Sequence, residues 1–120
     1  MTGEQSMVVH YLEIVTNDVD GMIQLYSETL GLAFGEAVPD LGQARVASRS
    51  DGTRIGIRAP LAEHETPIMR SYVATDDIEA AVQRAEKAGA MVAYPPTQQG
   101  DAGTFAIVIH DGLQHGLWQG

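Results

Sequence analysis

Four histidines raise the possibility of a metal site. Two of them, His110 and His115, flank an Asp-Gly pair in the stretch IHDGLQHGLWQG (109–120), which also holds the only tryptophan. His10 lies near the start of the chain and His64 near its middle. Imidazole nitrogens and carboxylate oxygens bind zinc, iron and similar ions. The alternative is a β-hairpin in which the histidines are incidental, and the choice depends on the elements that position them.

An internal repeat defines those elements. Residues 16–32 (TNDVDGMIQLYSETLGL) resemble residues 74–90 (ATDDIEAAVQRAEKAGA), and both have apolar residues at helical spacing. Each segment follows a strand-like run and precedes a loop with proline, then two strand-like runs around an Asp-Gly turn. Short strands near 33–37 and 91–94 complete the units. We therefore predict two βαβββ modules, at about 7–59 and 68–119, with helices near 18–30 and 77–88 and a connector at 60–67.

This duplicated plan resembles the vicinal oxygen chelate superfamily, also called the glyoxalase/bleomycin resistance/dioxygenase superfamily. The resemblance is carried by VVHYLEIVTNDVDGMIQLYSETLGL, SYVATDDIEAAVQRAEKAGA and GTFAIVIHDGLQHGLW, and it covers about residues 7–119. It implies one glyoxalase-like domain over 1–120, of the α+β class. In that fold the two tandem modules form a curved, cavity-enclosing mixed sheet. It does not imply one function, because the superfamily holds isomerases, dioxygenases, epimerases, thiol transferases and non-catalytic drug binders.

The resemblance also implies where a metal would bind. Metal-dependent members take one His or Glu ligand from the first and the last strand of each module. The corresponding positions hold Tyr11, Gly56, Arg70 and Gly116. These residues cannot make the usual site, so we predict no bound metal and no cofactor.

A shift of strand register is the alternative, because a one-residue slip would bring His10 and His115 to the ligand positions. Side-chain alternation argues against it: His10 shares its parity with Leu12 and Ile14, and His115 shares its parity with Leu117. We therefore expect both histidines to point away from the cavity and the C-terminal stretch to be a hairpin.

The residues of the opposite parity are the candidates for ligand binding. Arg54 shares this parity but lies near a turn, and Gly56 and Gly116 are expected to leave space. The candidates are Tyr11, Glu13, Arg58, Arg70, Tyr72, Gln114 and Trp118. The aromatic rings can hold a planar or amphiphilic molecule, and Arg58 or Arg70 can bind a carboxylate through two parallel hydrogen bonds. Each also has a structural interpretation, as core aromatics and as an ion pair between Glu13 and Arg70.

Three functions remain open from the sequence. The first is a metal-free protein of the bleomycin-resistance type that sequesters or carries a small aromatic or amphiphilic molecule. The second is a lyase, isomerase or dioxygenase, with Glu13 as a weak candidate for a catalytic base. The third is an accessory domain that acts through its surfaces. Bleomycin-type binding is the prediction that the residues favour most, because the metal positions lack ligands.

Composition limits the partners. The net charge of −9, from 16 acidic and 7 basic residues, argues against nucleic-acid binding. No apolar run reaches the roughly 18 residues of a membrane span, and no secretory signal is recognisable, so a cytoplasmic location is expected. The absence of cysteine excludes thiolate chemistry. An open sheet has exposed edges, so we expect a homodimer, with or without exchange of modules between the chains.

Overall fold

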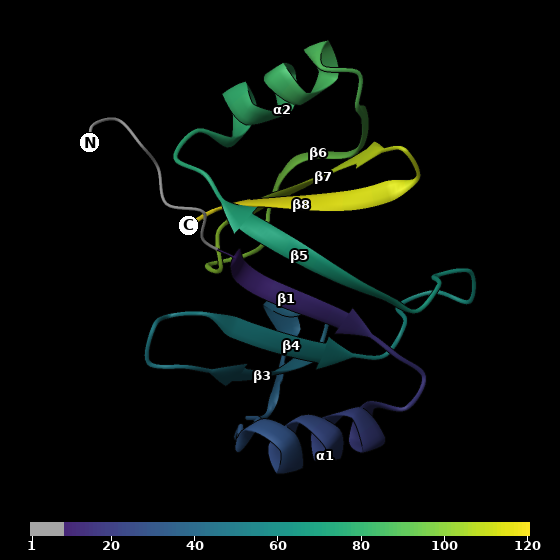
Figure 1. The fold of residues 1–120 in the computed structure, drawn as a ribbon, viewed down its shortest axis with the longest axis vertical. Coiled ribbons are helices and arrows are strands. Elements are labelled where there is room, and N and C mark those ends of the chain that lie inside the picture. Colours follow the sequence, from purple (N-terminus) through teal and green to yellow (C-terminus); the bar gives the residue numbers. More distant parts are fainter. Residues whose placement is uncertain (1–8) are drawn as a thin grey trace.

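Eight strands form a single mixed sheet in the computed structural model, which describes residues 9–120 (Figure 1). Their order across the sheet is β2-β3-β4-β1-β5-β8-β7-β6. The strands are β1 (Val9–Val15), β2 (Ala37–Val38), β3 (Ala44–Ser48), β4 (Arg54–Arg58), β5 (Ile68–Ala74), β6 (Met91–Gln98), β7 (Thr104–His110) and β8 (Leu113–Gln119). The first four strands and the last four therefore occupy opposite halves of the sheet. The expected start of the first module, at about residue 7, lies outside the described residues.

The first strands of the two modules hold the halves together. β1 pairs with β5 in antiparallel orientation, whereas β1 pairs with β4 and β5 pairs with β8 in parallel orientation. Parallel pairs need a crossover connection, and each module supplies one helix, α1 (Val19–Leu30) or α2 (Ile78–Lys87). The arrangement confirms the predicted α+β fold with two tandem βαβββ modules in a curved mixed sheet.

Each helix begins where a short acidic side chain can cap it. The Asp18 carboxylate accepts a hydrogen bond from the Gly21 amide, and the Asp77 carboxylate accepts one from the Ala80 amide. Such caps satisfy amide donors that have no partner within the helix. Gly31 then ends α1 in the left-handed conformation, at φ 68°.

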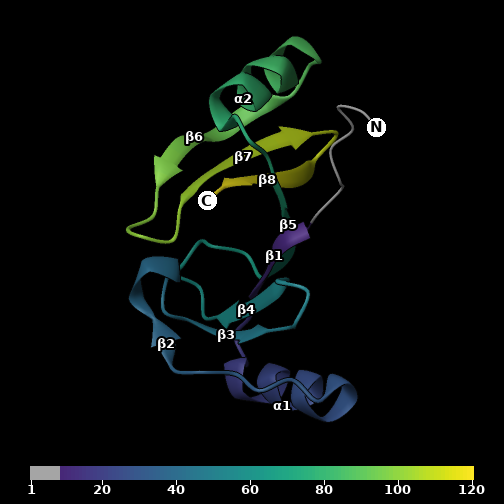
Figure 2. The same cartoon turned by 90° about the vertical axis from the view of Figure 1, so that its left-hand side faces the viewer.

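The sheet bends so that its two halves face each other. Figure 2 shows the bend as a U, with α1 and α2 on the outside and β1 and β5 at its base. Alternation along the strands sends one set of side chains outward and the other onto the concave face. Under α2, Ile78 and Val82 pack with Ala106 of β7. On the concave face, a separate core contains Tyr11, Leu41, Ala44, Tyr72, Ile107 and Trp118.

Two strands differ from their predicted bounds. The strand expected near 33–37 is the two-residue β2, which pairs with β3 from Ala37 onward. The strand expected near 91–94 continues to Gln98 through Pro95 and Pro96, although a proline loop was predicted there. β6 is an edge strand, and its register with β7 shifts between Tyr94 and Thr97. Prolines are tolerated at such an edge because they have no ladder bond to donate on the open side.

Among residues 9–120, no helix has both the length and the apolar character that crossing a membrane requires.

Candidate binding cavity

The concave face of the sheet encloses a cavity of about 650 Å³. Its volume lies within the range of small-molecule sites. All seven residues that alternation placed on the cavity face line it: Tyr11, Glu13, Arg58, Arg70, Tyr72, Gln114 and Trp118. The structure thus brings these residues together, and their role in ligand binding stays a prediction.

Strand register explains why residues far apart in the chain meet here. Glu13 of β1 lies opposite Gly56 of β4 on one side and Arg70 of β5 on the other. Tyr11 lies opposite Tyr72 in the same antiparallel pair. Because both are direct cross-strand pairs, their side chains leave the same face of the sheet. One pair supplies charge and the other supplies aromatic surface.

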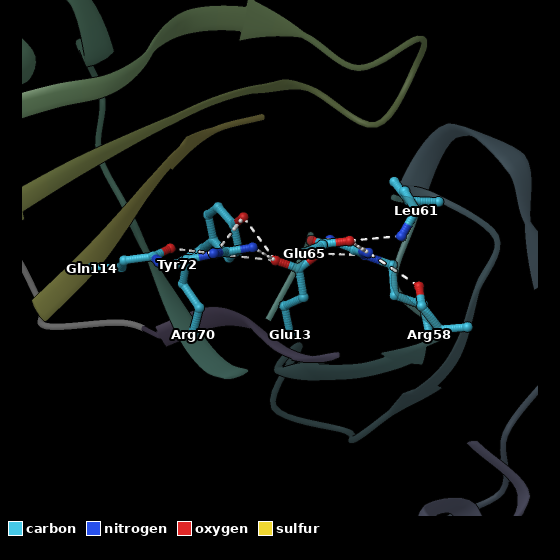
Figure 3. Close-up of polar contacts among 8 residues, drawn as sticks. Glu13, Arg58, Leu61, Glu65, Arg70, Tyr72 and Gln114 are labelled. Atoms are coloured by element: carbon cyan, nitrogen blue, oxygen red, sulfur yellow. Dashed lines mark hydrogen bonds and ion pairs between the residues drawn. The ribbon is translucent and has the colours of Figure 1, made fainter. Parts of the chain in front are cut away.

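Glu13 is the centre of a buried ionic network (Figure 3). Its Oε2 accepts a hydrogen bond from Nε of Arg58 at 2.8 Å, and its Oε1 accepts one from Nη2 of Arg70 at 2.5 Å. Arg70 also donates to the side-chain oxygen of Gln114. Burial alone would raise the pKa of Glu13, but the charges of Arg70 and Arg58 and their hydrogen bonds outweigh it and lower the pKa. Glu13 is therefore a carboxylate at neutral pH, and it is held in place by two cations.

The connector completes the network, which sequence reasoning missed. Glu65 binds Arg58 through two parallel hydrogen bonds, from Nη1 at 2.9 Å and from Nη2 at 2.7 Å. Hydrogen bonds from Arg58 lower the pKa of Glu65 to about 2, against the opposing effect of burial. His64 and other connector residues also line the cavity. Side-chain alternation could not reveal them, because it applies only to strands.

Aromatic rings form the other part of the wall. Trp118 lies 5.8 Å from Tyr11 and 5.6 Å from Tyr72 between ring centroids, and Phe105 packs against Tyr72 at 6.3 Å. The indole nitrogen of Trp118 donates to the carbonyl of Ala102. Phe105 and Ala102 belong to β7 and its preceding loop, so the second module supplies most of this surface. Tilted and edge-on contacts of this kind are favourable for aromatic rings.

The two tyrosine hydroxyls differ in their bonding. The Tyr72 hydroxyl donates to Oε1 of Glu13 at 2.9 Å and accepts from Nε of Arg70 at 3.1 Å. The Tyr11 hydroxyl is buried and has no hydrogen-bond partner within residues 9–120. Buried hydroxyls nearly always have a partner, so the Tyr11 hydroxyl, which lies against Gly56 of β4, is an unsatisfied polar group among the described residues.

The four metal-ligand positions of the resemblance do not fit a metal. A Cβ atom added at Gly56 would lie 1.6 Å from the Tyr11 hydroxyl, and one added at Gly116 would lie 2.4 Å from the Tyr72 ring. The two tyrosines therefore fill the space that Gly56 and Gly116 were expected to leave, because the hydroxyl end of Tyr11 lies over Gly56 and the ring of Tyr72 lies over Gly116. The remaining position holds Arg70, whose cation is paired with Glu13. These groups offer a metal no imidazole and no free carboxylate.

The histidines lie outside this arrangement, apart from His64. His115 is exposed, as its parity with Leu117 predicted. The pairing of β1 with β5 is irregular between Val9 and Tyr11, and His10 sits at this irregularity. There its Nε2 lies 3.1 Å from Nη2 of Arg54, and its ring lies 5.4 Å from Trp118. The prediction that His10 shares the face of Leu12 and Ile14 is therefore wrong, because the irregularity breaks the alternation, although His10 does not line the cavity. Burial, followed by the charge of Arg54, lowers the pKa of His10, so its imidazole is neutral at neutral pH.

Comparison with known proteins gives the family of the chain. The family model of the Glyoxalase/Bleomycin resistance protein/Dioxygenase superfamily matches residues 8–114. The chain belongs to this superfamily, which confirms the family that the repeat predicted.

Two curated relatives are similar over most of the chain. Proteins named "Putative glyoxylase CFP32", from Mycobacterium bovis and Mycobacterium tuberculosis, are each 27% identical over 116 residues. The match covers 92% of this chain but 44% of each relative. The chain thus spans less than half the length of the curated relatives it matches.

Solved structures share the fold at lower identity. A hypothetical protein from Bacillus halodurans superposes with a TM-score of 0.73 at 16% identity, covering 97% of this chain and 96% of that one. Methylmalonyl-CoA epimerase from Mycobacterium tuberculosis superposes with a TM-score of 0.69 at 19% identity, covering 98% and 93%. These likenesses establish the glyoxalase-like architecture. The function must be argued from the residues of the cavity.

Proposed function

We propose that this protein binds a small aromatic or amphiphilic molecule in its cavity without a metal ion. The observation that carries the proposal is that the expected metal-ligand positions hold no metal-binding side chains, and that aromatic rings and paired charges line the cavity instead. Tyr11 and Arg70 occupy two of those positions, and the tyrosine rings block the two glycine positions. Pockets for small organic molecules commonly combine apolar and aromatic walls with a few oriented polar groups.

The lining supports a ligand with a flat apolar body and at least one charged group. Tyr11, Tyr72 and Trp118 line the cavity and supply its aromatic surface. The net charge of −9 favours the approach of cations, while Arg58 and Arg70 favour an anionic group inside the cavity. A ligand of mixed character satisfies both better than a simple cation does.

The enzymatic alternative, a lyase, isomerase or dioxygenase of the same superfamily, requires a group that can move protons or electrons. Glu13 is the carboxylate best placed to be a base, but two arginines and the Tyr72 hydroxyl stabilise its ionised form. Because these contacts lower its pKa, Glu13 is a weaker base than a free carboxylate. The same contacts favour a structural role for Glu13 in shaping a binding cavity.

A fluorescence screen tests the binding proposal. Trp118 is the only tryptophan and lies in the cavity wall, so a ligand stacked nearby should change its emission. The screen uses planar antibiotics and aromatic acids, each titrated in the presence and the absence of EDTA. We expect saturable changes that EDTA does not alter. Binding that EDTA abolishes, or one tightly held metal ion per chain, would contradict the proposal.

A further inference from the structure

We infer that the guanidinium of Arg58 is the anion-binding group of the cavity, and that a ligand carboxylate binds there by displacing the carboxylate of Glu65. This inference rests on the proposed binding function and narrows it. The ligand class is an aromatic or amphiphilic carboxylate. The Glu65 side chain holds the position on Arg58 that the carboxylate of this ligand would take.

The geometry at Arg58 is that of a bound carboxylate. Nη1 and Nη2 of Arg58 point to Oε1 and Oε2 of Glu65 at 2.9 and 2.7 Å, so both oxygens are engaged side by side. Guanidinium groups bind free carboxylates and phosphates with the same paired bonds. Arg58 keeps Nε for Glu13, at 2.8 Å. Arg58 thus uses Nε to bind Glu13 of the sheet and uses Nη1 and Nη2 to bind Glu65, the partner that a ligand carboxylate would replace.

Glu65 is more easily displaced than Glu13, although both bind Arg58. Glu13 lies on the central strand β1, and its side chain is 10% exposed and accepts hydrogen bonds from both Arg70 and Tyr72 as well. The Glu65 side chain is 25% exposed and lies on the connector, outside any strand. Removing Glu13 would leave two buried cations short of a partner, whereas Arg58 is the one cation that removing Glu65 would leave short of a partner.

The ion pair between Glu65 and Arg58 is the polar contact that attaches the connector to the sheet. Its internal hydrogen bonds run from the Leu61 amide to Oε1 of Glu65 and from the Glu65 amide to the Ala62 carbonyl. Within the described chain, the hydrogen bonds that link residues 60–67 to other segments all run from Arg58 to Glu65. Displacement of Glu65 thus breaks no strand pairing. Its cost is the ion pair and the local turn at Leu61.

Charge balance selects the ligand that can make this exchange. Glu13 and Glu65 balance Arg58 and Arg70, so the network has no net charge. When Glu65 leaves, one buried positive charge lacks a partner, which is unfavourable in a partly apolar cavity. A ligand carboxylate restores the balance, but a neutral or cationic ligand of the same shape does not. Tyr72 and Trp118 line the same cavity and offer aromatic surface for the body of such a ligand.

Calorimetric titration with two matched probes tests the exchange. The probes are 2-naphthoate and its neutral isostere 2-naphthamide, at neutral pH, with the wild type, Glu65→Gln and Glu63→Gln. Glu63 is an exposed connector carboxylate that does not line this cavity, so its variant makes the same charge change without freeing Arg58. We expect Glu65→Gln to bind 2-naphthoate roughly tenfold or more tightly than the wild type. Its affinity for 2-naphthamide, and both affinities of Glu63→Gln, should stay near the wild-type values.

Amide hydrogen exchange gives a second readout on the unmodified protein. Glu65 accepts the hydrogen bond of the Leu61 amide, so displacement should remove this protection. Saturation with 2-naphthoate should therefore accelerate exchange at Leu61, while saturation with 2-naphthamide should not. Unfolding of each variant in urea shows whether the fold is retained.

The outcomes separate this inference from the proposed function. Binding of 2-naphthamide to the wild type with a change in Trp118 emission supports an aromatic cavity whatever Glu65 does. The exchange is wrong if Glu65→Gln gains no affinity for 2-naphthoate, if it gains equally for 2-naphthamide, or if Glu63→Gln gains as much. Failure of both probes with all three proteins also contradicts it, because a freed Arg58 should then bind a carboxylate. Unchanged exchange at Leu61 in saturating 2-naphthoate would contradict it independently.

Discussion

The two tyrosines at the base of the cavity have hydroxyls in opposite hydrogen-bonding states. They are cross-strand neighbours with ring centroids 6.1 Å apart. Tyr72 uses its hydroxyl in the ionic network, whereas the Tyr11 hydroxyl is buried without a partner among the described residues. An unsatisfied buried polar group lowers the stability of the fold. This contrast makes the pair a matched test.

We predict that Tyr11→Phe leaves the free energy of unfolding unchanged or raises it by up to about 1 kcal/mol, because it removes an unsatisfied group. Tyr72→Phe should lower it by about 1–2 kcal/mol, because the Glu13 and Arg70 bonds are lost. Urea unfolding of the three proteins measures both changes. Equal destabilisation by the two substitutions would show that the Tyr11 hydroxyl has a partner in the folded protein.

The acidic residues of the network make stability depend on pH. The pKa values of Glu13 and Glu65 are lowered in the folded protein, that of Glu65 to about 2, while an unfolded Glu titrates near 4.5. A lowered pKa stabilises the fold above the unfolded value and loses this effect as the pH falls. We predict that wild-type stability falls between about pH 5 and pH 2, and that Glu65→Gln shows a shallower fall.

Urea unfolding at a series of pH values, with Glu63→Gln as the control, measures this difference. Parallel curves for wild type and Glu65→Gln would show that the Arg58 pair does not persist in solution.

The faces of the strands could be predicted from the sequence, but the packing of side chains between neighbouring strands could not. Alternation in β1, β4, β5 and β8 placed the cavity-facing residues correctly, because a period of two leaves only two faces. Alternation could not show that the two tyrosines cover Gly56 and Gly116, because it gives the face of a side chain but not its rotamer. It also could not place Glu65, whose position depends on the path of the connector. Elements with a periodic pattern are readable from sequence, and an irregular segment that folds over them is not.

Gly116→Ala tests the close approach of β8 to β5. The added Cβ would lie 2.4 Å from the Tyr72 ring and 2.7 Å from the Ser71 carbonyl oxygen, which belongs to the backbone. We predict a loss of about 1–3 kcal/mol in the free energy of unfolding, as for other overpacked cores. Gly35→Ala is the control, because its nearest non-neighbouring atom would be 3.9 Å away. Similar values for the two variants in urea unfolding would argue against so close a contact of β8 with β5.

At the scale of the whole molecule, the sheet formed by residues 9–120 has β2 at one edge and β6 at the other. Met91 and Tyr94 on β6 are more than half exposed, and α1 buries no residue and leaves Leu25 56% exposed. Exposed edges and apolar side chains are commonly covered by a second copy of the chain. We predict a homodimer with about twice the chain mass of 12.9 kDa in sedimentation equilibrium at micromolar concentration. A mass of one chain under these conditions would contradict it.

Calorimetry on cavity variants tests most directly whether the concave face of the sheet is a metal-free binding site. The tightest ligand of the fluorescence screen is titrated, in EDTA, into the wild type, Trp118→Ala and Leu113→Ala. Leu113 lies on β8 with Trp118 but is 62% exposed and outside the cavity. We predict that Trp118→Ala weakens binding by about 1–3 kcal/mol, as for a buried aromatic anchor, while Leu113→Ala binds like the wild type. Equal affinity in all three proteins, or binding that returns only when a metal ion is added, would contradict metal-free binding on this face.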